Sequence, residues 1–209
     1  MITSKCKICR RLGVKLFLKG ERCLSPKCEI TKKPYPPGMR GKRRKAPLSE
    51  YGKELREKQK LKNWYNLREA QFKKYVKEIL RKRSRVEDAG SLLIKKLEMR
   101  LDNVVFRLGF ASSRIQARQF VLHGHFLVND KIVKIPSHEV KKDDKINIKP
   151  NSAKKTAFKN FSTLLKKHQP PSWLELNKEK LEGKVIDSPK LEEVVPPAEI
   201  SSIFEYYSR

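Results

Sequence analysis

Residues 100–129 read RLDNVVFRLGFASSRIQARQFVLHGHFLVN, and this stretch decides the fold. Apolar residues at the spacing of one helix face predict a helix over residues 91–109, which Gly109 is placed to end. Ser113, with a Gln three residues later, matches a capping-box pattern and predicts a second helix that stops at Gly124. The sequence therefore indicates two helices, with a change of pattern after Gly124.

Short apolar segments after the second helix predict a small sheet. Strands are expected at residues 126–128, 132–135 and 146–148, with a turn at Asn129 and Asp130 between the first two. Two helices packed on this antiparallel sheet make a compact unit, so the predicted fold class is α+β.

All four cysteines lie near the N-terminus, with the spacing Cys6-x2-Cys9-x13-Cys23-x4-Cys28. Two residues between the first pair let both sulfurs reach one ion, and four thiolates can surround Zn²⁺ tetrahedrally. The sequence therefore predicts an N-terminal zinc knuckle with one structural zinc ion. An iron–sulfur cluster uses the same four thiolates and is one alternative. Four unrelated buried thiols are the other.

The positive charge of the chain is high and unevenly distributed. The 209 residues include 50 Lys and Arg against 23 Asp and Glu, a formal net charge of +27. Residues 1–85 carry 28 basic and 7 acidic residues, whereas residues 173–209 carry 5 basic and 8 acidic ones. This charge distribution is typical of nucleic-acid-binding proteins, and it predicts that the first 85 residues lie against phosphates.

Other classes of protein are less compatible with the sequence. No apolar run approaches the roughly 20 residues that span a bilayer, and the N-terminus lacks the apolar segment of a secretory signal. We therefore expect a cytoplasmic chain with no membrane partner, in which clustered thiols favour metal over disulfides. The four histidines form no triad or ligand pattern, so we expect no enzyme activity.

Residues 48–85 indicate two helices that follow a proline-rich linker. Ser49 can cap the first helix, and Asn66 with Glu69 three residues later forms a capping box for the second. The expected buried stripe of the second helix consists of Phe72, Val76 and Ile79.

Several stretches resemble one known family. The quoted segment RLDNVVFRLGF, followed by Ser113-Arg114-x-x-Ala117-Arg118-Gln119 and His123-Gly124-His125-x-x-Val128-Asn129, closely resembles the bacterial-type small-subunit ribosomal protein S-four family. The stretches SEYGKELREKQ at 49–59, KLFLKGxRC at 15–23, YPPG at 35–38 and EYYSR at 205–209 resemble the same family.

The resemblance implies a structural constituent of the small ribosomal subunit that binds 16S-type rRNA as a primary protein and nucleates assembly of the subunit body. It also implies a position beside ribosomal protein S-five at the mRNA entry channel, contacts with mRNA and other small-subunit proteins, and an influence on translational accuracy. The chain would be a monomer within the ribosome, or within an organelle ribosome if its gene is organellar. Two alternatives are a repressor of its own operon and an accessory RNA-binding module of an RNA-modifying enzyme.

Four segments are expected on this basis. Residues 1–47 form the cysteine module and basic linker, and residues 48–97 form a helical rRNA-binding region. Residues 98–160 form the S-four-type RNA-binding module. Residues 161–209 form a C-terminal segment that packs back on the helical region.

Basic side chains on these segments are the candidate RNA contacts, through phosphates and 2′-hydroxyls more than through base sequence. The candidates are Lys42, Arg43, Arg44, Lys45, Lys53, Arg56, Lys58, Lys62, Arg81, Arg83, Arg100, Arg107, Arg114, Arg118, His123 and His125.

Two positions depart from the pattern of the family. Asp130 stands where Gly is usual, in a hairpin turn that requires a positive φ, and Asp143-Asp144 stands where Gly-Asp is usual. We expect altered or strained turns there, with the fold retained.

Overall fold

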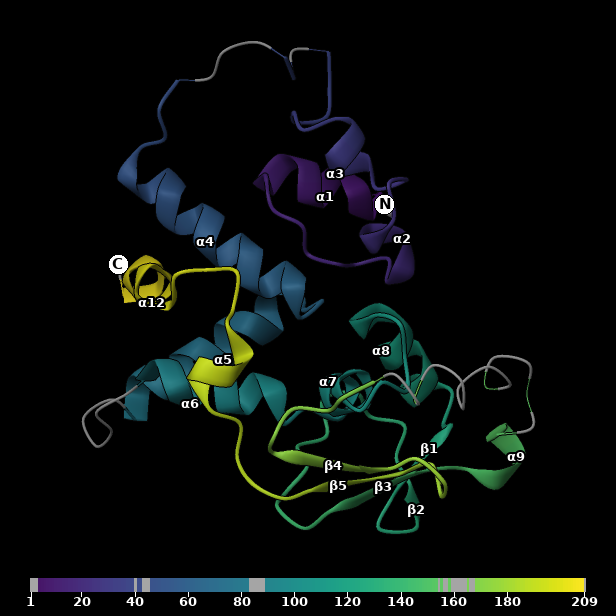
Figure 1. Cartoon of the computed structure of the whole chain (residues 1–209). Helices are drawn as coiled ribbons and strands as arrows, with labels where there is room; N and C mark the ends of the chain where they lie inside the picture. Colours follow the sequence, from purple (N-terminus) through teal and green to yellow (C-terminus); the bar gives the residue numbers. More distant parts are fainter. Residues whose placement is uncertain are drawn as a thin grey trace. The chain divides into compact units, whose positions relative to one another are not determined.

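The computed structural model describes residues 4–39, 41–42, 46–82, 89–153, 155, 158, 165 and 168–208 (Figure 1). The chain divides into two compact units. Unit 1 comprises Met1–Leu93 together with Val195–Arg209, and unit 2 comprises Ile94–Val194. Mixed helix and small antiparallel sheet confirm the predicted α+β class.

Unit 1 is helical in the part that the structure describes. Its elements are α1 (Lys5–Leu12), α2 (Glu21–Leu24), α3 (Glu29–Lys32), α4 (Glu50–Trp64), α5 (Glu69–Lys82) and α12 (Ile200–Ser208). Helix α6 (Ala89–Glu98) begins in unit 1 and ends in unit 2.

The N-terminal ends of α4 and α5 differ in how well the sequence predicted them. The Ser49 hydroxyl accepts a hydrogen bond from the Gly52 backbone N–H at 3.3 Å, as a helix N-cap does, which confirms the predicted start of α4. The capping box predicted at Asn66 is wrong, because α5 begins only at Glu69 and Asn66 has a φ of 53°. Glu69 instead binds side chains from α4 and α12.

The C-terminal helix α12 completes unit 1 by packing on α4 and α5 (Figure 1). Aromatic residues are enriched in strands, yet residues 203–207 belong to helix α12. Ile203 and Phe204 are buried, and Tyr207 follows Phe204 by three residues, so helical spacing places all three on one face.

Unit 2 contains α7 (Leu101–Arg107), α8 (Arg114–Leu122) and a five-stranded antiparallel sheet. Its strands are β1 (Phe126–Val128), β2 (Lys131–Ile132), β3 (Lys145–Ile148), β4 (Leu174–Asn177) and β5 (Glu182–Val185), in the order β2-β1-β3-β5-β4. The register pairs Val128 with Ile146 and Ile146 with Gly183. Two short helices, α9 (Pro150–Ala153) and α11 (Leu191–Val194), complete the described elements.

The helix predicted over residues 91–109 is broken in two. The backbone N–H of Leu101 donates to His138 at 2.8 Å, and that of Val140 donates to Met99 at 2.8 Å. The Leu101 N–H and the Met99 carbonyl therefore bond to a neighbouring segment, which interrupts the helical hydrogen bonds between α6 and α7. Gly109, at a φ of 83°, ends the second part as predicted.

Strands β4 and β5 were not predicted and lie in the segment 161–209 that was expected to pack on the helical region. The structure corrects this for residues 174–185, which extend the sheet of unit 2. Gly183 lets β5 pack closely on Leu108, because a Cβ at residue 183 would lie 2.3 Å from Leu108 Cδ1. Leu108, Trp173 and Val185 belong to the same buried core.

The two departures from the family pattern lie in left-handed backbone conformations. Asn129 and Asp130 have φ values of 48° and 63°, as the hairpin turn between β1 and β2 requires, and Asp143 has a φ of 68°. Asn129 is held by its side chain, which donates to Asp144 at 2.7 Å and accepts from the Lys145 backbone N–H at 2.9 Å.

Asp130→Gly should stabilise unit 2 by about 0.5–1 kcal/mol, because glycine adopts the left-handed conformation without a Cβ clash. Asn129→Gly, the matched control, should destabilise unit 2 because it removes two hydrogen bonds. Chemical denaturation of both variants measures the difference. A lower unfolding free energy for Asp130→Gly would contradict the assignment of strain to Asp130.

Candidate nucleic-acid interface

The four cysteines line one pocket in unit 1, together with Lys5, Lys19 and Glu29. Cys9, Cys23 and Cys28 are buried, and the Cys23 sulfur accepts a hydrogen bond from the Lys19 backbone N–H at 3.4 Å. Burial raises the pKa of the Cys9 thiol. The spacing of the cysteines therefore does bring four thiols to one place.

The pocket does not, however, show a metal centre. Within the described residues, no group of three or more His, Cys, Asp or Glu side chains is placed to hold a metal ion. The predicted zinc knuckle is thus not shown by the structure.

A buried network centred on Glu98 holds two of the arginines in unit 2. The Glu98 carboxylate accepts hydrogen bonds from Arg107 at 2.9 and 3.0 Å and from Asn103 Nδ2 at 2.6 Å. Arg114 donates to Asn103 at 2.7 Å, and its guanidinium lies 3.8 Å from Glu98. Charge-assisted hydrogen bonds of this kind fix α7 and α8 to the end of α6.

A second buried carboxylate, Asp102, binds the other two arginines. Arg100 forms a two-point ion pair with Asp102, at 3.0 Å from Nε and 2.6 Å from Nη2. Arg118 lies 3.5 Å from the same carboxylate, and its side chain is 29% exposed. Arg100 is 2% exposed and Arg114 8%, so both side chains bind carboxylate or amide groups within unit 2. Their predicted role as RNA contacts stays a prediction.

Arg107 and Arg118 remain at the edge of this network. Their side chains are 21% and 29% exposed, and each is oriented by a carboxylate behind it. Four guanidinium groups share two carboxylates, so the network keeps an excess of positive charge. Arg107 and Arg118 are thus preorganised cations at the surface of α7 and α8.

His123 and His125 lie at the end of α8. Their rings stack at a centroid distance of 5.9 Å and an interplanar angle of 9°. His123 is exposed and His125 is half-buried, with its Nδ1 2.9 Å from the Ser152 hydroxyl. The structure brings these two candidates together.

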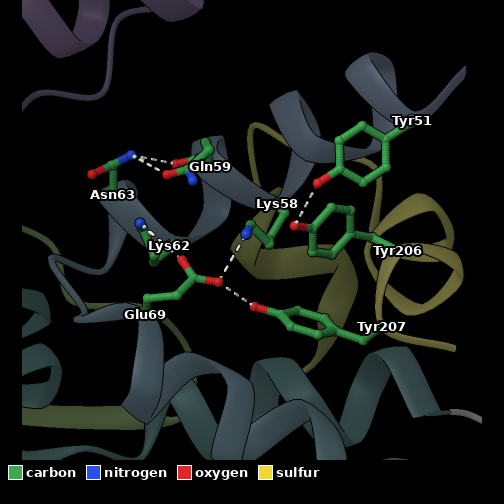
Figure 2. Close-up of polar contacts among 8 residues, drawn as sticks. All are labelled: Tyr51, Lys58, Gln59, Lys62, Asn63, Glu69, Tyr206 and Tyr207. Atoms are coloured by element: carbon green, nitrogen blue, oxygen red, sulfur yellow. Dashed lines mark hydrogen bonds and ion pairs between the residues drawn. The ribbon is translucent and has the colours of Figure 1, made fainter. Parts of the chain in front are cut away.

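Figure 2 shows the polar cluster that joins α4, α5 and α12 in unit 1. Lys58 donates to Glu69 at 2.8 Å, Lys62 donates to Glu69 at 3.0 Å, and the Tyr207 hydroxyl donates to Glu69 at 2.8 Å (Figure 2). The Lys58 ammonium also lies 4.3 Å from the centre of the Tyr206 ring. Lys58 is only 4% exposed and binds groups of α5 and α12, so it holds the helices together, and its predicted contact with RNA stays a prediction.

The pKa of Glu69 follows from the same contacts. Partial burial would raise it, but hydrogen bonds from Lys58, Tyr207 and Lys62 outweigh burial and lower the pKa to about 2. Burial and the neighbouring carboxylate raise the pKa of Tyr207. Glu69, Tyr206 and Tyr207 were not predicted as partners of Lys58, because residues 58, 69 and 206–207 are far apart in the sequence.

Other candidate RNA contacts in unit 1 have side chains that are exposed to solvent. Lys53 and Arg81 are exposed on α4 and α5, and Lys42 is exposed with its ammonium 5.5 Å from the Tyr35 ring. The α5 face opposite its buried stripe also carries the exposed Lys73, Lys74 and Lys77. Arg56 is exposed but donates to the Leu12 backbone carbonyl at 2.7 Å, which ties α4 to α1. Arg43, Arg44, Lys45 and Arg83 lie outside the described residues.

The chain matches two protein families in succession. Residues 1–98 match the family described as Ribosomal protein S4/S9 N-terminal domain, and residues 99–146 match the S4 domain. The small ribosomal subunit protein uS4 of Halothermothrix orenii is 49% identical over 204 residues, which cover 98% of this chain and 96% of that protein.

The chain belongs to the uS4 family. The small ribosomal subunit protein uS4 of Caldicellulosiruptor saccharolyticus is 49% identical over 208 residues, covering 100% of this chain and 98% of that protein. The uS4 of Natranaerobius thermophilus is 46% identical over 98% of this chain and 96% of its own length. The predicted membership of the S-four family is confirmed, and uS4 is a family of ribosomal proteins and not of enzymes. No helix within the described ranges is long and apolar enough to cross a membrane.

Glu69→Gln should loosen α12 by about 1 kcal/mol, because Lys58 and Lys62 lose a charged acceptor that is itself partly exposed. A free Glu protonates near 4.5, so the wild-type stabilisation is complete above that pH and is lost as the pH falls toward about 2. Hydrogen exchange of the α12 amides should be about fivefold faster in the variant near neutral pH and should depend less on acid.

Glu205→Gln is the matched control, because Glu205 is an exposed carboxylate on the same helix. Equal exchange rates for Glu69→Gln and wild type would show that Glu69 does not hold α12.

Proposed function

We propose that this chain is a structural constituent of the small ribosomal subunit that binds 16S-type rRNA through exposed cations on both units. The observation that carries the proposal is full-length identity near 49% to proteins named small ribosomal subunit protein uS4. A net charge of +27, exposed cations on α4 and α5, and the partly exposed Arg107 and Arg118 on α7 and α8 support it.

The binding mechanism is electrostatic docking with recognition of RNA shape. Lys and Arg that neutralise phosphates release counterions, so the affinity for rRNA falls steeply with salt. Because A-form RNA has a deep and narrow major groove, the exposed cations contact phosphates and 2′-hydroxyls. The proposed contacting set keeps Lys42, Arg43, Arg44, Lys45, Lys53, Arg81, Arg83, Arg107, Arg118, His123 and His125, and adds Lys73, Lys74 and Lys77. It leaves out five of the predicted contacts, which bind groups within the chain: Arg56, Lys58, Lys62, Arg100 and Arg114.

The resemblance to the S-four family supports finer assignments. In this proposal the chain binds rRNA early, nucleates assembly of the subunit body and remains as a monomer in the cytoplasmic ribosome. It lies beside ribosomal protein S-five at the mRNA entry channel and influences translational accuracy from that position.

A structural zinc ion belongs to the same proposal. Four thiols that line one pocket are a suitable donor set for Zn²⁺, although their sulfurs are not arranged as a ligand group without it. Cys6, Cys9, Cys23 and Cys28 would hold the ion. Bound zinc would cross-link α1 to the segments around α2 and α3, a region with few buried residues of its own.

The double variant Lys53→Gln/Arg81→Gln should weaken binding of small-subunit rRNA. Loss of two phosphate contacts should reduce the slope of log K against log salt by about 1–2. Filter binding at several salt concentrations measures this, with the exposed Lys180→Gln as the control outside the proposed contact set. An unchanged slope would show that α4 and α5 do not face RNA.

Metal analysis should find about one zinc ion per chain, and Cys9→Ser should lose it and loosen only the N-terminal helices. Hydrogen exchange of α1 reports the loosening. Iron in place of zinc would favour the cluster alternative, and protein prepared without chelators that contains neither metal would refute the proposed site.

A further inference from the structure

The turn after α8 presents two imidazole rings at the surface of unit 2. His123 and His125 flank Gly124, whose φ of 69° reverses the chain between α8 and β1. The two rings are nearly parallel, with an interplanar angle of 9° and a centroid distance of 5.9 Å. Side chains two residues apart would diverge in a helix, so the turn creates this pair.

The His125 ring is fixed by its neighbours. Its Nδ1 lies 2.9 Å from the Ser152 hydroxyl, and its ring forms T-shaped contacts with Phe120 and Phe158 at centroid distances of 5.9 and 5.4 Å. When Nδ1 binds the hydroxyl, Nε2 is the nitrogen left to bind a ligand. The exposed His123 ring stacks beside it.

Within the described residues, the side chains that act on the charge of His125 are Lys155, His123 and Lys149, and each disfavours its protonated form. Lys134 lies over the same turn, within 3.1 Å of a Cβ built on Gly124. Burial first, and then these cations, lower the pKa of His125. Lys134 and Lys155 are exposed, so this cluster offers positive charge to a ligand from solvent.

We propose that His123 and His125 form a proton-coupled site for an RNA phosphodiester, flanked by Lys149 and Lys155. The inference rests on the proposed function and specifies the chemistry of one contact. A phosphodiester oxygen accepts a hydrogen bond from the protonated imidazole, while the lysines contribute attraction that does not depend on pH near neutrality.

Proton uptake follows from the change in surroundings on binding. In the free chain, burial and then the neighbouring cations lower the pKa of His125, which favours its neutral form near pH 7. A bound phosphate adds negative charge, which raises the pKa of His125 in the complex above that in the free chain. Between these two values His125 takes up a proton on binding, so the affinity for RNA increases as the pH falls.

The test is the affinity of the full chain for small-subunit rRNA between about pH 5.5 and 8 at constant ionic strength. Uptake of one proton changes the affinity by up to about tenfold per pH unit. Wild type should therefore gain more affinity on acidification than His123→Gln/His125→Gln. His138→Gln, which alters a histidine outside the cluster, should behave as wild type.

The outcomes separate this inference from the proposed function. Tight rRNA binding with the same pH dependence in wild type and the double variant would overturn the histidine site and leave rRNA binding intact. Absence of rRNA binding by wild type at every pH would overturn both. If the double variant folds poorly, His125→Gln alone should show a smaller pH dependence than wild type, because Gln keeps a polar side chain beside Ser152 but does not titrate.

Discussion

Two buried carboxylates, Glu98 and Asp102, determine what the arginines of unit 2 can do. Glu98 is fully buried, and it orders Asn103, Arg107 and, at longer range, Arg114. A charge in such a site is tolerated only with partners, so removal of either carboxylate would leave buried guanidinium groups uncompensated. The network thereby fixes α7 and α8 and leaves Arg107 and Arg118 at the surface in defined orientations.

Unit 1 applies the same chemistry across a much larger separation in sequence. Lys58 and Lys62 on α4 share Glu69 on α5, and Tyr207 of α12 closes the cluster. The last helix of the chain is therefore needed to complete a unit that begins at the N-terminus. Part of the positive charge of this protein therefore stabilises its own fold. Other positive charges are exposed on α4 and α5 and beside the turn after α8, at Lys134 and Lys155.

The parts of the fold that depend on local pattern could be predicted from the sequence. Ser49 and Ser113 cap helices, Gly109 ends one, and β1 lies where the apolar segment after Gly124 indicated. The break between α6 and α7 could not be predicted, because it depends on backbone bonds to residues 138 and 140. Strands β4 and β5 were not predicted because their sequence is charged and contains a glycine. The pairing of β5 with β3 depends on the close packing of Gly183 on Leu108, which is distant in sequence.

Among the site residues, charge alone identified candidates but could not separate contact residues from structural ones. In the sequence, Lys58 and Arg100 look no different from the basic residues around them. In the structure both are buried, and they form ion pairs with Glu69 and Asp102. Helical periodicity does predict which lysines of α5 face solvent, because these lysines lie opposite the buried Phe72, Val76 and Ile79.

Lysine acetylation, read by mass spectrometry with and without small-subunit rRNA, tests this division most directly. We predict that Lys53 and Lys77 react in the free chain and are protected by rRNA, whereas Lys58 is unreactive in both states. Reaction of Lys58 in the free chain, with protection on rRNA binding, would contradict the assignment of its charge to the fold.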